Sequence, residues 1–339
     1  MGIDAAPASQ ATLEIDLAAV ARNWNALRER LAEGSECGAV LKADAYGLGA
    51  AEVAQALGKA GCRRFFVAHL GEALALRNIV PSKSRIFVLN GVLEGEEQGY
   101  AADNIVPVLN DPGQVQRWSR HAGVIPSRKS MEGIALAYVM SHLARAEEAV
   151  EMNREQLAAL KALQARWPGI PASLANSSGI FLGEAWHLDL VRPGAALYGI
   201  NPVPGKPNPQ ACVATLSASV LQVRDIAPAQ TVGYGATWTA RAPTRVATIA
   251  VGYADGWMRS LSNRGGAHYR GKLLPFIGRV SMDLVTLDAS ACPELAPGHR
   301  VELLGPNRPV DAVAAEAGTI GYEVLTSLGR RFARMYRPA

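Results

Sequence analysis

The sequence predicts an α/β barrel of the TIM type followed by a mostly β domain. Short apolar strands alternate with helical stretches from about residue 17 to 200, and β-rich runs separated by turn residues follow. Repeated apolar strands with helices between them are typical of a parallel sheet that is buried on both faces and closes into a barrel. We expect the barrel at 17–205 and the second domain at 206–339. The N-terminal strand 11–16 is expected to belong to the second domain.

The first domain is predicted to hold seven strands. They are expected at Ala39–Lys42, Arg64–Ala68, Arg85–Leu89, Ile105–Leu109, Ile134–Ser141, Ala172–Ala175 and Leu188–Val191. The first helix is predicted from Leu17 to about Leu31, with Asp16 as its N-cap. Further helices lie between most of the strands, at Gly49–Lys59, Gly71–Asn78, Gly113–Arg120 and Ala144–Ala165.

A closed barrel of this type has eight strands, so one strand–helix unit is missing here. Between Leu109 and Ile134 there is room for one helix and a polar linker at 123–133, but for no further strand. The loss of one barrel strand exposes two sheet edges and opens the core.

The second domain follows the linker Asn201–Pro209, in which seven of nine residues are Pro, Gly or Asn. Turn residues separate the β-rich runs, which favours a mostly antiparallel sheet. The strands are expected at Ala214–Arg224, Arg245–Val251, Lys272–Phe276, Ser281–Leu287 and Arg300–Leu304, and two short helices at Val310–Ala317 and Tyr322–Gly329.

Composition argues against several classes of partner. The net charge is only +4 and the basic residues are scattered, which argues against a nucleic-acid surface. The four cysteines lie far apart without metal-ligand spacing, so we expect no metal site and reduced, buried thiols. The N-terminus has no signal-peptide pattern and no segment is apolar enough to span a membrane, so we expect a cytoplasmic protein.

Lys42 ends the apolar run 39–41 and is the residue most indicative of chemistry. A lysine that leaves a buried strand is desolvated, which lowers the pKa of its amine. Such an amine can hold an aldehyde cofactor covalently. The alternative is an ordinary surface lysine at a strand end.

Two short segments after the last two barrel strands, Asn176-Ser177 and Gly194-Ala195, indicate a phosphate site. In TIM-type barrels the loop N–H groups at this place commonly bind a phosphate, and a glycine lets the main chain approach it closely. Ser177 adds a hydroxyl donor. The alternative is a pair of ordinary turns between strand and helix.

Seven motifs in consecutive order resemble those of alanine racemases, which are pyridoxal phosphate (PLP) enzymes with a barrel and a β-domain. The resemblance covers nearly the whole chain. The motifs are AVLKADAYGLG at 39–49, SLANS at 173–177, DLVRPGAALYG at 189–199, VGYGAT at 232–237, VGYADG at 251–256, GRVSMD at 278–283 and GTIGYE at 318–323.

This resemblance implies a PLP site on the barrel. Lys42 would hold the cofactor, and His142 resembles the imidazole placed against its ring, although a satisfied core histidine is the alternative. The residues implied at the phosphate and near the ring are Tyr46, Asn176, Ser177, Gly194, Ala195 and Tyr322.

Arg192 stands within an apolar strand end and needs a buried partner, because a guanidinium keeps its charge. If that partner is the PLP ring nitrogen, the nitrogen stays unprotonated and the cofactor becomes a weaker electron sink. A weak sink suits a racemase, which removes one proton briefly. A salt bridge to Asp189 or to another carboxylate is the alternative.

The resemblance further implies a two-base racemisation of alanine. Lys42 and Tyr234 would serve opposite faces of the substrate Cα, and Tyr234 needs assistance because a free tyrosine titrates near 10. Taken alone, a tyrosine in a Gly-Tyr-Gly turn is more often a surface aromatic, and only the resemblance favours the catalytic role of Tyr234. In the family the β-domain of one subunit completes the barrel site of the other, which implies a homodimer. Met282 would bind the substrate carboxylate through its N–H.

Tyr253, Tyr322 and Arg279 would narrow the entrance, which selects a small side chain. The function implied is the supply of D-alanine for peptidoglycan.

The chain departs from the family between its fourth and sixth strands. The family has a run close to Val-Asp-Thr-Gly-Met-x-Arg-Leu-Gly there, whose arginine contacts the cofactor and the substrate carboxylate. This chain reads VIPSRKSMEG at 124–133 instead, and about thirty residues are absent. Arg128 or Lys129 is a candidate replacement. Two further functions therefore remain open: a racemase or decarboxylase for another amino acid, and a non-catalytic PLP-binding protein.

Overall fold

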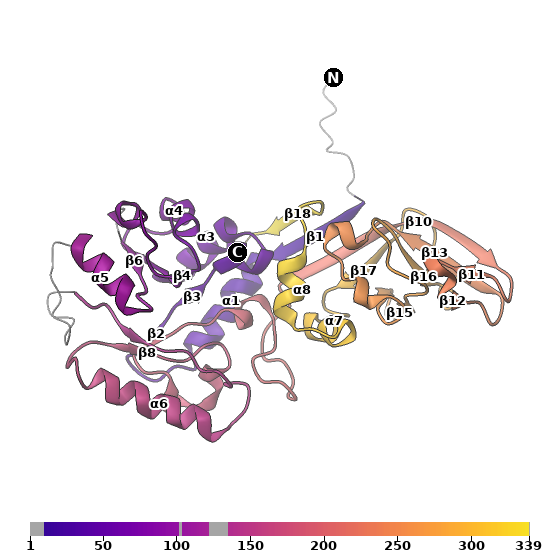
Figure 1. The fold of residues 1–339 in the computed structure, drawn as a ribbon. Helices are drawn as coiled ribbons and strands as arrows, with labels where there is room; N and C mark the ends of the chain where they lie inside the picture. The colour runs from indigo at the N-terminus through magenta and orange to yellow at the C-terminus, as the bar shows by residue number, and fades with distance from the viewer. Residues whose placement is uncertain (1–9, 102–103, 122–134, 339) are drawn as a thin grey trace. The chain divides into compact units, whose positions relative to one another are not determined.

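The computed structural model describes residues 10–101, 104–121 and 135–338 and divides the chain into two compact units (Figure 1). One unit runs from Leu17 to Ala211, and the other combines the N-terminal residues up to Asp16 with Cys212–Pro338. The division falls a few residues after the boundary expected at 205/206. Each unit has its own sheet and its own core.

The Leu17–Ala211 unit contains two parallel four-stranded sheets that share one strand. Their orders are β3-β4-β5-β6 and β2-β9-β8-β7. The strands are β2 (Glu36–Cys37), β3 (Ala39–Val40), β4 (Arg64–Val67), β5 (Arg85–Val88), β6 (Ile105–Pro107), β7 (Val139–Met140), β8 (Ala172–Ser173) and β9 (Leu190–Val191). Each lies within or beside a strand expected from the sequence.

Gly38 alone separates β2 from β3, so the two form one continuous strand. Its N–H donates to the Val191 carbonyl over 2.9 Å, which extends the pairing with β9, while the Leu41 N–H donates to the Phe66 carbonyl next to β4. A Cβ at position 38 would lie 3.0 Å from the Phe66 ring, so the close packing requires glycine. Among the described residues the result is a row of seven parallel strands, as many as the sequence predicts.

The row of strands is open between β6 and β7, which stand at the ends of their sheets. Within the described ranges no strand lies between them. The linker predicted at 123–133 and the first residue of the strand predicted at Ile134 fall outside the described residues. The place of the missing barrel unit is therefore the place where the two sheets end.

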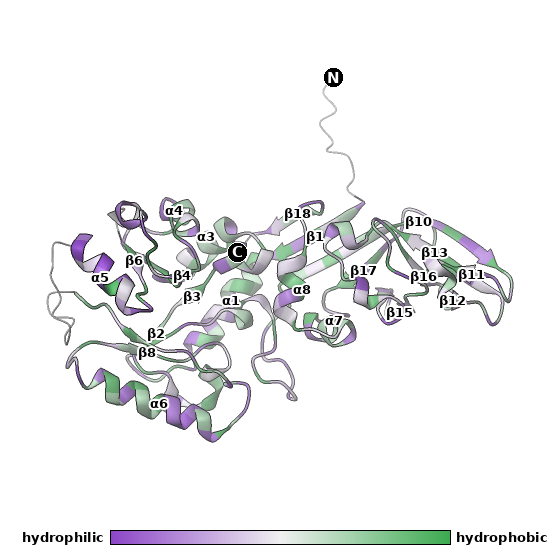
Figure 2. Cartoon of the chain, in the orientation of Figure 1, coloured by the Kyte–Doolittle hydropathy of each residue, from purple (hydrophilic) through white to green (hydrophobic). Residues whose placement is uncertain are grey.

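Six helical segments accompany these strands: α1 (Leu17–Arg28), α2 (Lys42–Gly47), α3 (Ala50–Ala60), α4 (Leu70–Arg77), α5 (Pro112–His121) and α6 (Glu151–Gln164). The helix expected from Ala144 begins only at Glu151. The buried Asn153 amide donates to the carbonyls of Arg145 and Glu148, at 3.0 and 2.7 Å, and holds the preceding residues in a turn. Hydrophobic and hydrophilic residues alternate along α6 (Figure 2), as expected for a helix that covers a sheet.

Short 3₁₀ segments complete this unit: η1 (Glu97–Ala101), η2 (Gly179–Leu182), η3 (Glu184–Trp186) and η4 (Ala195–Tyr198). Apolar strand residues fill the barrel interior. Phe66 and Phe87, on neighbouring strands, stack with ring centroids 4.7 Å apart. The strands β7 and β8 pack with α6 in a cluster that includes Val139, Leu160 and Ala172.

The second unit is built on a mixed eight-stranded sheet. Its main path is β15-β14-β17-β10-β1-β18, and β13 and β16 extend it from β10. The strands are β1 (Ala11–Asp16), β10 (Ala214–Ile226), β13 (Thr244–Ile249), β14 (Gly266–Tyr269), β15 (Lys272–Pro275), β16 (Val285–Asp288), β17 (Arg300–Leu304) and β18 (Ala333–Arg337). A separate hairpin pairs β11 (Thr231–Val232) with β12 (Trp238–Thr239).

The N-terminal strand β1 lies inside this sheet, between β10 and the edge strand β18. It pairs antiparallel with β10, where Leu13 faces Leu216, and parallel with β18, where Leu13 faces Arg334. The helices α7 (Val310–Ala317) and α8 (Gly321–Ser327) lie where two were expected, and η5 (Tyr234–Ala236), η6 (Tyr253–Asp255) and η7 (Arg259–Leu261) form turns. The strand expected from Ser281 begins only at Val285.

Two further findings concern composition. Among the described residues, no helix combines the length and apolar character needed to cross a membrane. Three of the free cysteines, Cys37, Cys62 and Cys292, are buried, as expected, but Cys212 is exposed, so the expectation of a buried thiol is wrong there. Cys212 follows directly after the division between the units.

Candidate active site

Lys42 leaves the barrel directly after β3, at the carboxyl end of the strand. Leu41 before it is fully buried, but the Lys42 side chain is exposed in the described chain. The desolvation expected from the sequence is therefore wrong for this chain by itself, because the neighbouring residues leave the amine open to water. An exposed amine at the end of a barrel strand is accessible to a cofactor.

Lys42 is followed by a left-handed turn. Four consecutive non-glycine residues, Ala43 to Tyr46, have φ values between 53° and 57°. A left-handed conformation costs about 1–2 kcal/mol per non-glycine residue, so surrounding contacts must hold this turn in place. Asp44 supplies one of them, since its Oδ1 accepts the Ala50 N–H over 2.7 Å at the start of α3.

Glu72 supplies the second contact, a role that the sequence analysis did not predict. Its Oε1 accepts the Ala43 N–H over 2.7 Å, while its Oε2 accepts the N–H groups of Ala68 and His69 over 2.8 and 3.1 Å. Glu72 lies in the first turn of α4, where a carboxylate commonly caps a helix. It joins the turn after Lys42 to the end of the neighbouring strand β4.

Tyr46 lies against Gly194, as expected for two residues of one site. A Cβ built on Gly194 would lie 2.3 Å from the Tyr46 hydroxyl oxygen, so this approach requires glycine. The Tyr46 ring packs on Tyr198 with centroids 4.7 Å apart. The Tyr198 hydroxyl in turn donates to the Val40 carbonyl over 2.8 Å, which fixes η4 to the strand that carries Lys42.

The two segments expected to bind a phosphate are hydrogen-bonded to each other. The Ser177 hydroxyl oxygen accepts the N–H groups of Gly194 and Ala196 over 3.0 and 3.1 Å. The Gly194 N–H therefore donates within the protein, to Ser177. Asn176 accepts the Gly179 N–H over 2.9 Å and so shapes the start of η2.

Three other N–H groups at this place remain available. Those of Ser177, Ser178 and Ala195 donate no hydrogen bond within the described part of the chain, although all three residues are buried. A buried N–H without a partner is costly, so such a group calls for an acceptor from outside the protein. Three N–H donors without a partner on two adjacent segments, at the starts of η2 and η4, suit an anion such as a phosphate.

Arg192 is 6 % exposed and carries its charge among neutral partners. Its Nη1 donates to the Ser173 hydroxyl and its Nη2 donates to the Ser141 carbonyl over 2.6 Å. The alternative of a salt bridge to Asp189 is wrong, because the Asp189 carboxylate accepts the Ala172 N–H over 2.7 Å instead. Burial lowers the pKa of Arg192 to about 10, so it remains protonated near neutral pH.

His142 follows β7 and lies close to both Lys42 and Arg192. Its ring keeps a surface open to solvent, but the protein atoms crowded around it lower the pKa of His142 to about 4. The positive charges of Arg192 and Lys42 add to this lowering. The imidazole is therefore neutral near pH 7. The barrel unit brings Lys42, His142 and Arg192 together, as the sequence predicted.

The second unit presents Tyr234 on the η5 turn, and its side chain is 74 % exposed. The glycines on either side have positive φ values, 76° and 73°, and lie against Arg279. A Cβ at Gly235 would lie 3.1 Å from Nη1 of Arg279. Tyr234 and Arg279 therefore belong to one surface of this unit.

Met282 and Tyr253 lie side by side on the same unit. The Tyr253 N–H donates to the Ser281 carbonyl over 3.0 Å, and the Ala254 N–H donates to the Met282 carbonyl over 2.9 Å. Within the described ranges the Met282 N–H itself donates no hydrogen bond. This is the arrangement expected of a main-chain donor that serves a ligand.

Tyr322 is the second residue of α8 and is partly exposed. The C-terminal end of α8 packs against the loop that carries Tyr253, because a Cβ at Gly256 would lie 1.7 Å from the Ser327 carbonyl oxygen. The exposed large side chains of this unit include Tyr234, Tyr253, Met282, Ile320 and Tyr322. Apolar side chains exposed in such numbers commonly mark an interaction surface.

Family models match both units. The model of the alanine racemase N-terminal domain matches residues 15–128 and 122–202, and that of the C-terminal domain matches residues 213–336. The alanine racemase of Acidiphilium cryptum is 48 % identical over 354 positions, which cover 96 % of this chain and 98 % of the relative. A protein of Agrobacterium fabrum named "Alanine racemase, catabolic" is 46 % identical, with 98 % of this chain and 93 % of the relative covered.

The solved structures that resemble this chain are also alanine racemases. The alanine racemase of Bartonella henselae, a structure with covalently bound pyridoxal phosphate, has a TM-score of 0.92 and 39 % identity. The match covers 97 % of this chain and 100 % of the Bartonella henselae chain. A biosynthetic alanine racemase of Pseudomonas aeruginosa has a TM-score of 0.89 and 30 % identity, with 97 % and 99 % covered.

The comparisons also locate the missing barrel unit. The alignment with the Acidiphilium cryptum relative has 354 positions but spans 96 % of these 339 residues, about 325, so about thirty positions are occupied in the relative alone. The N-terminal family model is matched in two segments that meet at 122–128. Matches over nearly the whole length, in both units, show that this chain belongs to the alanine racemase family.

Proposed function

We propose that the chain is a PLP-dependent alanine racemase that interconverts L- and D-alanine. The observation that carries this proposal is the group of Lys42, His142 and Arg192 beside three buried, unpartnered N–H groups. An exposed amine, a neutral imidazole, a buried cation and an anion site suit an aldehyde that carries a pyridine ring and a phosphate. The family membership supports the same assignment.

The residues of the barrel unit fit the cofactor. Lys42 would hold it covalently, the N–H groups of Ser177, Ser178 and Ala195 would bind its phosphate, and Tyr46 would lie close by. Asn176 and Gly194 would shape the anion site, and Tyr322 would reach the phosphate, by the family's pattern. When bound, the cofactor supplies a ring that withdraws electrons from the substrate Cα.

Arg192 would donate a hydrogen bond to the ring nitrogen without giving up its proton. Its two neutral partners hold the guanidinium in place but leave its charge uncompensated. A nitrogen that receives only a hydrogen bond stays unprotonated, which limits the charge that the ring withdraws. His142, neutral near pH 7, would lie against the ring without adding a charge of its own.

Racemisation requires a group that can take or give a proton on each face of the Cα. We assign these roles to the Lys42 amine and the Tyr234 hydroxyl. We further propose a homodimer in which the second unit of one subunit completes the barrel site of its partner. The exposed Tyr234, together with Met282 at 54 % exposure, gives the surface for such a contact.

The substrate carboxylate would bind the free N–H of Met282, while Tyr253, Tyr322 and Arg279 would narrow the entrance around a small side chain. This selects alanine over larger amino acids. We propose that the product supplies D-alanine for peptidoglycan. One relative is named catabolic and another biosynthetic, so growth of a D-alanine-requiring bacterium that carries this gene is the measurement that tests this role.

A second candidate is a PLP-binding protein without catalysis. The open barrel between β6 and β7 favours it, because the family's substrate-contacting arginine belongs to the run that this chain lacks. A racemase or decarboxylase for another amino acid is less well supported, since a decarboxylase gains from a protonated ring nitrogen.

One experiment separates these functions. Purified protein is loaded with PLP and incubated in deuterated water with L-alanine, L-serine or L-lysine, and α-proton exchange is followed by NMR. Exchange and racemisation at alanine, lost in Tyr234→Phe and Lys42→Ala, support the racemase. Cofactor binding that depends on Lys42 without any exchange supports the non-catalytic protein. An intact-mass measurement first establishes that the polypeptide has the stated length.

A further inference from the structure

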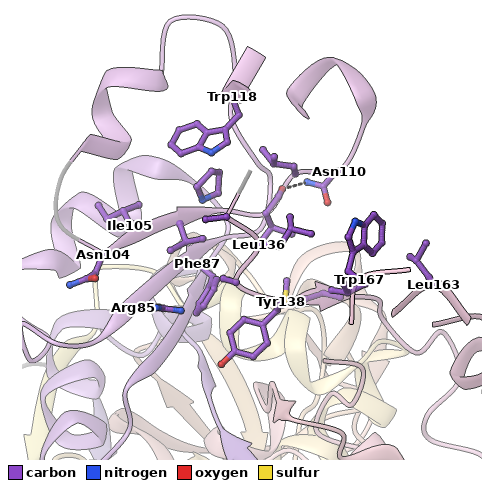
Figure 3. Close-up of a pocket in the computed structure, with 18 residues that line it drawn as sticks. Arg85, Phe87, Asn104, Ile105, Asn110, Trp118, Leu136, Tyr138, Leu163 and Trp167 are labelled. Atoms are coloured by element: carbon purple, nitrogen blue, oxygen red, sulfur yellow. Dashed lines mark hydrogen bonds between the residues drawn. The ribbon is translucent and has the colours of Figure 1, made fainter. Parts of the chain in front are cut away.

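The open side of the barrel contains a cavity of about 870 Å³. It is lined along one side by residues 104–110, which include β6, and along the other by residues 135–140, which include β7. Trp118 lies on one flank and Trp167 on another (Figure 3). The cavity therefore follows both strand edges from end to end rather than forming a round pocket at the barrel mouth.

Main-chain groups of β6 face this cavity. The Val108 N–H donates to the Val88 carbonyl and the Ile86 N–H donates to the Asn104 carbonyl, both over 2.9 Å, so residues 104 and 108 turn their main chain toward β5. Main-chain direction alternates along a strand. The N–H and C=O groups of Ile105 and Leu109 therefore point away from β5, toward the cavity.

The same holds for β7 on the opposite side. The Val139 N–H donates to the Pro171 carbonyl over 2.9 Å and the Ser141 N–H donates to the Ser173 carbonyl over 3.1 Å, so these residues face β8. Tyr138 and Met140 then turn their main chain toward the cavity. Both sides of the cavity thus present unpaired main-chain donors and acceptors, except that Pro107, which also faces the cavity, offers only its carbonyl.

We propose that this cavity is a binding groove for one parallel β-strand of about six residues, carried on an apolar strand–helix segment from outside the barrel. The lining spans about six residues on each side, or about 20 Å at 3.3 Å per residue. A strand satisfies both rows of main-chain groups, which an apolar small molecule cannot do. The groove is defined by residues 104–110 and 135–140.

The comparisons indicate the chemistry of this occupant. About thirty positions of the Acidiphilium cryptum relative have no counterpart here, and thirty residues is the length of one strand–helix unit. The helix of such a unit would cover the outer side of the groove, where Leu163 of α6 is an exposed apolar side chain. The occupant is therefore an extended apolar strand followed by an amphipathic helix.

The test uses a synthetic peptide of those thirty or so residues of the relative. It is added to the full chain, and hydrogen exchange of individual amides is measured. We expect saturable, one-to-one binding and at least tenfold slower exchange at Ile105, Leu109 and Met140, with amides in β13 unchanged. A scrambled peptide of the same composition should give neither effect.

Two variants distinguish binding in the groove from non-specific binding of the peptide to other parts of the protein surface. Leu109→Pro removes an N–H that faces the groove, and Leu163→Ala removes the apolar cover for the helix; each should weaken binding at least fivefold. Leu273→Ala, which changes a leucine on β15 that is more exposed than Leu163 (51 % against 39 %), is the control and should bind normally.

Three outcomes would overturn the proposal: equal binding of the scrambled peptide, absence of protection at the three amides, or protection of the same amides without peptide as the chain self-associates. The last outcome would assign the groove to a second copy. These readouts do not depend on racemase activity or cofactor, so a failed proposal here leaves the proposed function untouched, and the reverse holds as well.

Discussion

The Nε atom of Arg331 lies 3.1 Å from Oδ1 of Asp255, and this ion pair connects three loops of the second unit. The other carboxylate oxygen of Asp255 accepts the Gly252 N–H over 2.8 Å, next to Tyr253. Arg331 also binds Asp283 through Nη1 at 2.9 Å, next to Met282. One guanidinium therefore holds the two loops that are assigned to the substrate.

Replacing Arg331 should change substrate binding more than turnover. Arg331→Met leaves the nearly buried Asp255 carboxylate without its cation, so the loop of Tyr253 loosens against that of Met282. We expect the KM for alanine to rise about tenfold, equivalent to about 1.4 kcal/mol, with a smaller change in kcat. Steady-state kinetics in both directions measure this split.

Arg331→Lys should recover part of the loss, because it keeps the charge but not the two-sided geometry. Arg330→Met changes the neighbouring exposed arginine and is the matched control. An equal rise in KM for the control, or a fall in kcat alone, would contradict a positioning role for Arg331.

Removing the Glu72 carboxylate should loosen the left-handed turn after Lys42. Glu72→Ala deletes the acceptor for three main-chain N–H groups, so we expect a loss of about 1–2 kcal/mol in the free energy of unfolding. PLP should also be released faster, because the turn places Lys42. Urea unfolding and absorbance of bound PLP during dilution measure the two effects.

Glu52→Ala, in the first turn of the neighbouring helix α3, serves as the control and should change neither quantity. If Glu72→Ala lowers stability but leaves PLP release unchanged, Glu72 caps α4 without any role in placing Lys42.

Arg192→Met should separate stability from cofactor binding. The variant removes a buried charge, which raises the free energy of unfolding by about 1–4 kcal/mol. It also leaves the Ser173 hydroxyl and the Ser141 carbonyl without a donor, which lowers the free energy of unfolding by about 1–3 kcal/mol. We expect the apo-protein Tm to shift by only a few degrees. The rise in Tm on saturation with PLP should shrink markedly, which differential scanning fluorimetry measures; an unchanged rise would remove Arg192 from the cofactor site.

His142 should make stability depend on pH. Its pKa is lowered from 6.5 to about 4 by folding, so between these values the unfolded chain binds the extra proton and the folded chain does not. The His142 contribution to stability is therefore lost as the pH falls from about 6.5 toward 4. The Tm of the parent should fall faster over this range than that of His142→Gln, and parallel curves would show that the ring titrates normally.

The barrel was predictable from the sequence because its strands are continuous apolar runs of the right length. Where a turn depends on one buried polar side chain, prediction failed: the Asn153 amide binds the carbonyls of Arg145 and Glu148 and delays the start of α6. The strands β14 and β18 were missed because one begins with glycine and the other is rich in charge. The second of these is recognisable only from its pairing with β1.

The candidate site residues were predicted from motifs, but the hydrogen bonds around them were not. Glycine at 194 pointed to a close approach, yet sequence could not reveal that the Ser177 hydroxyl occupies its N–H. The exposure of Lys42 and the role of Glu72 depend on side chains about thirty residues apart in the chain. The roles assigned to Tyr234, Tyr322 and Arg279 remain predictions.

The left-handed turn at 43–46 sets a limit on protein engineering. Glycine adopts positive φ without penalty, so Ala43→Gly or Ala45→Gly would relax the folded chain, yet the same change would free the main chain beside Lys42. Heat resistance and reactivity thus compete within four residues, and selection for activity should leave their backbone strain intact.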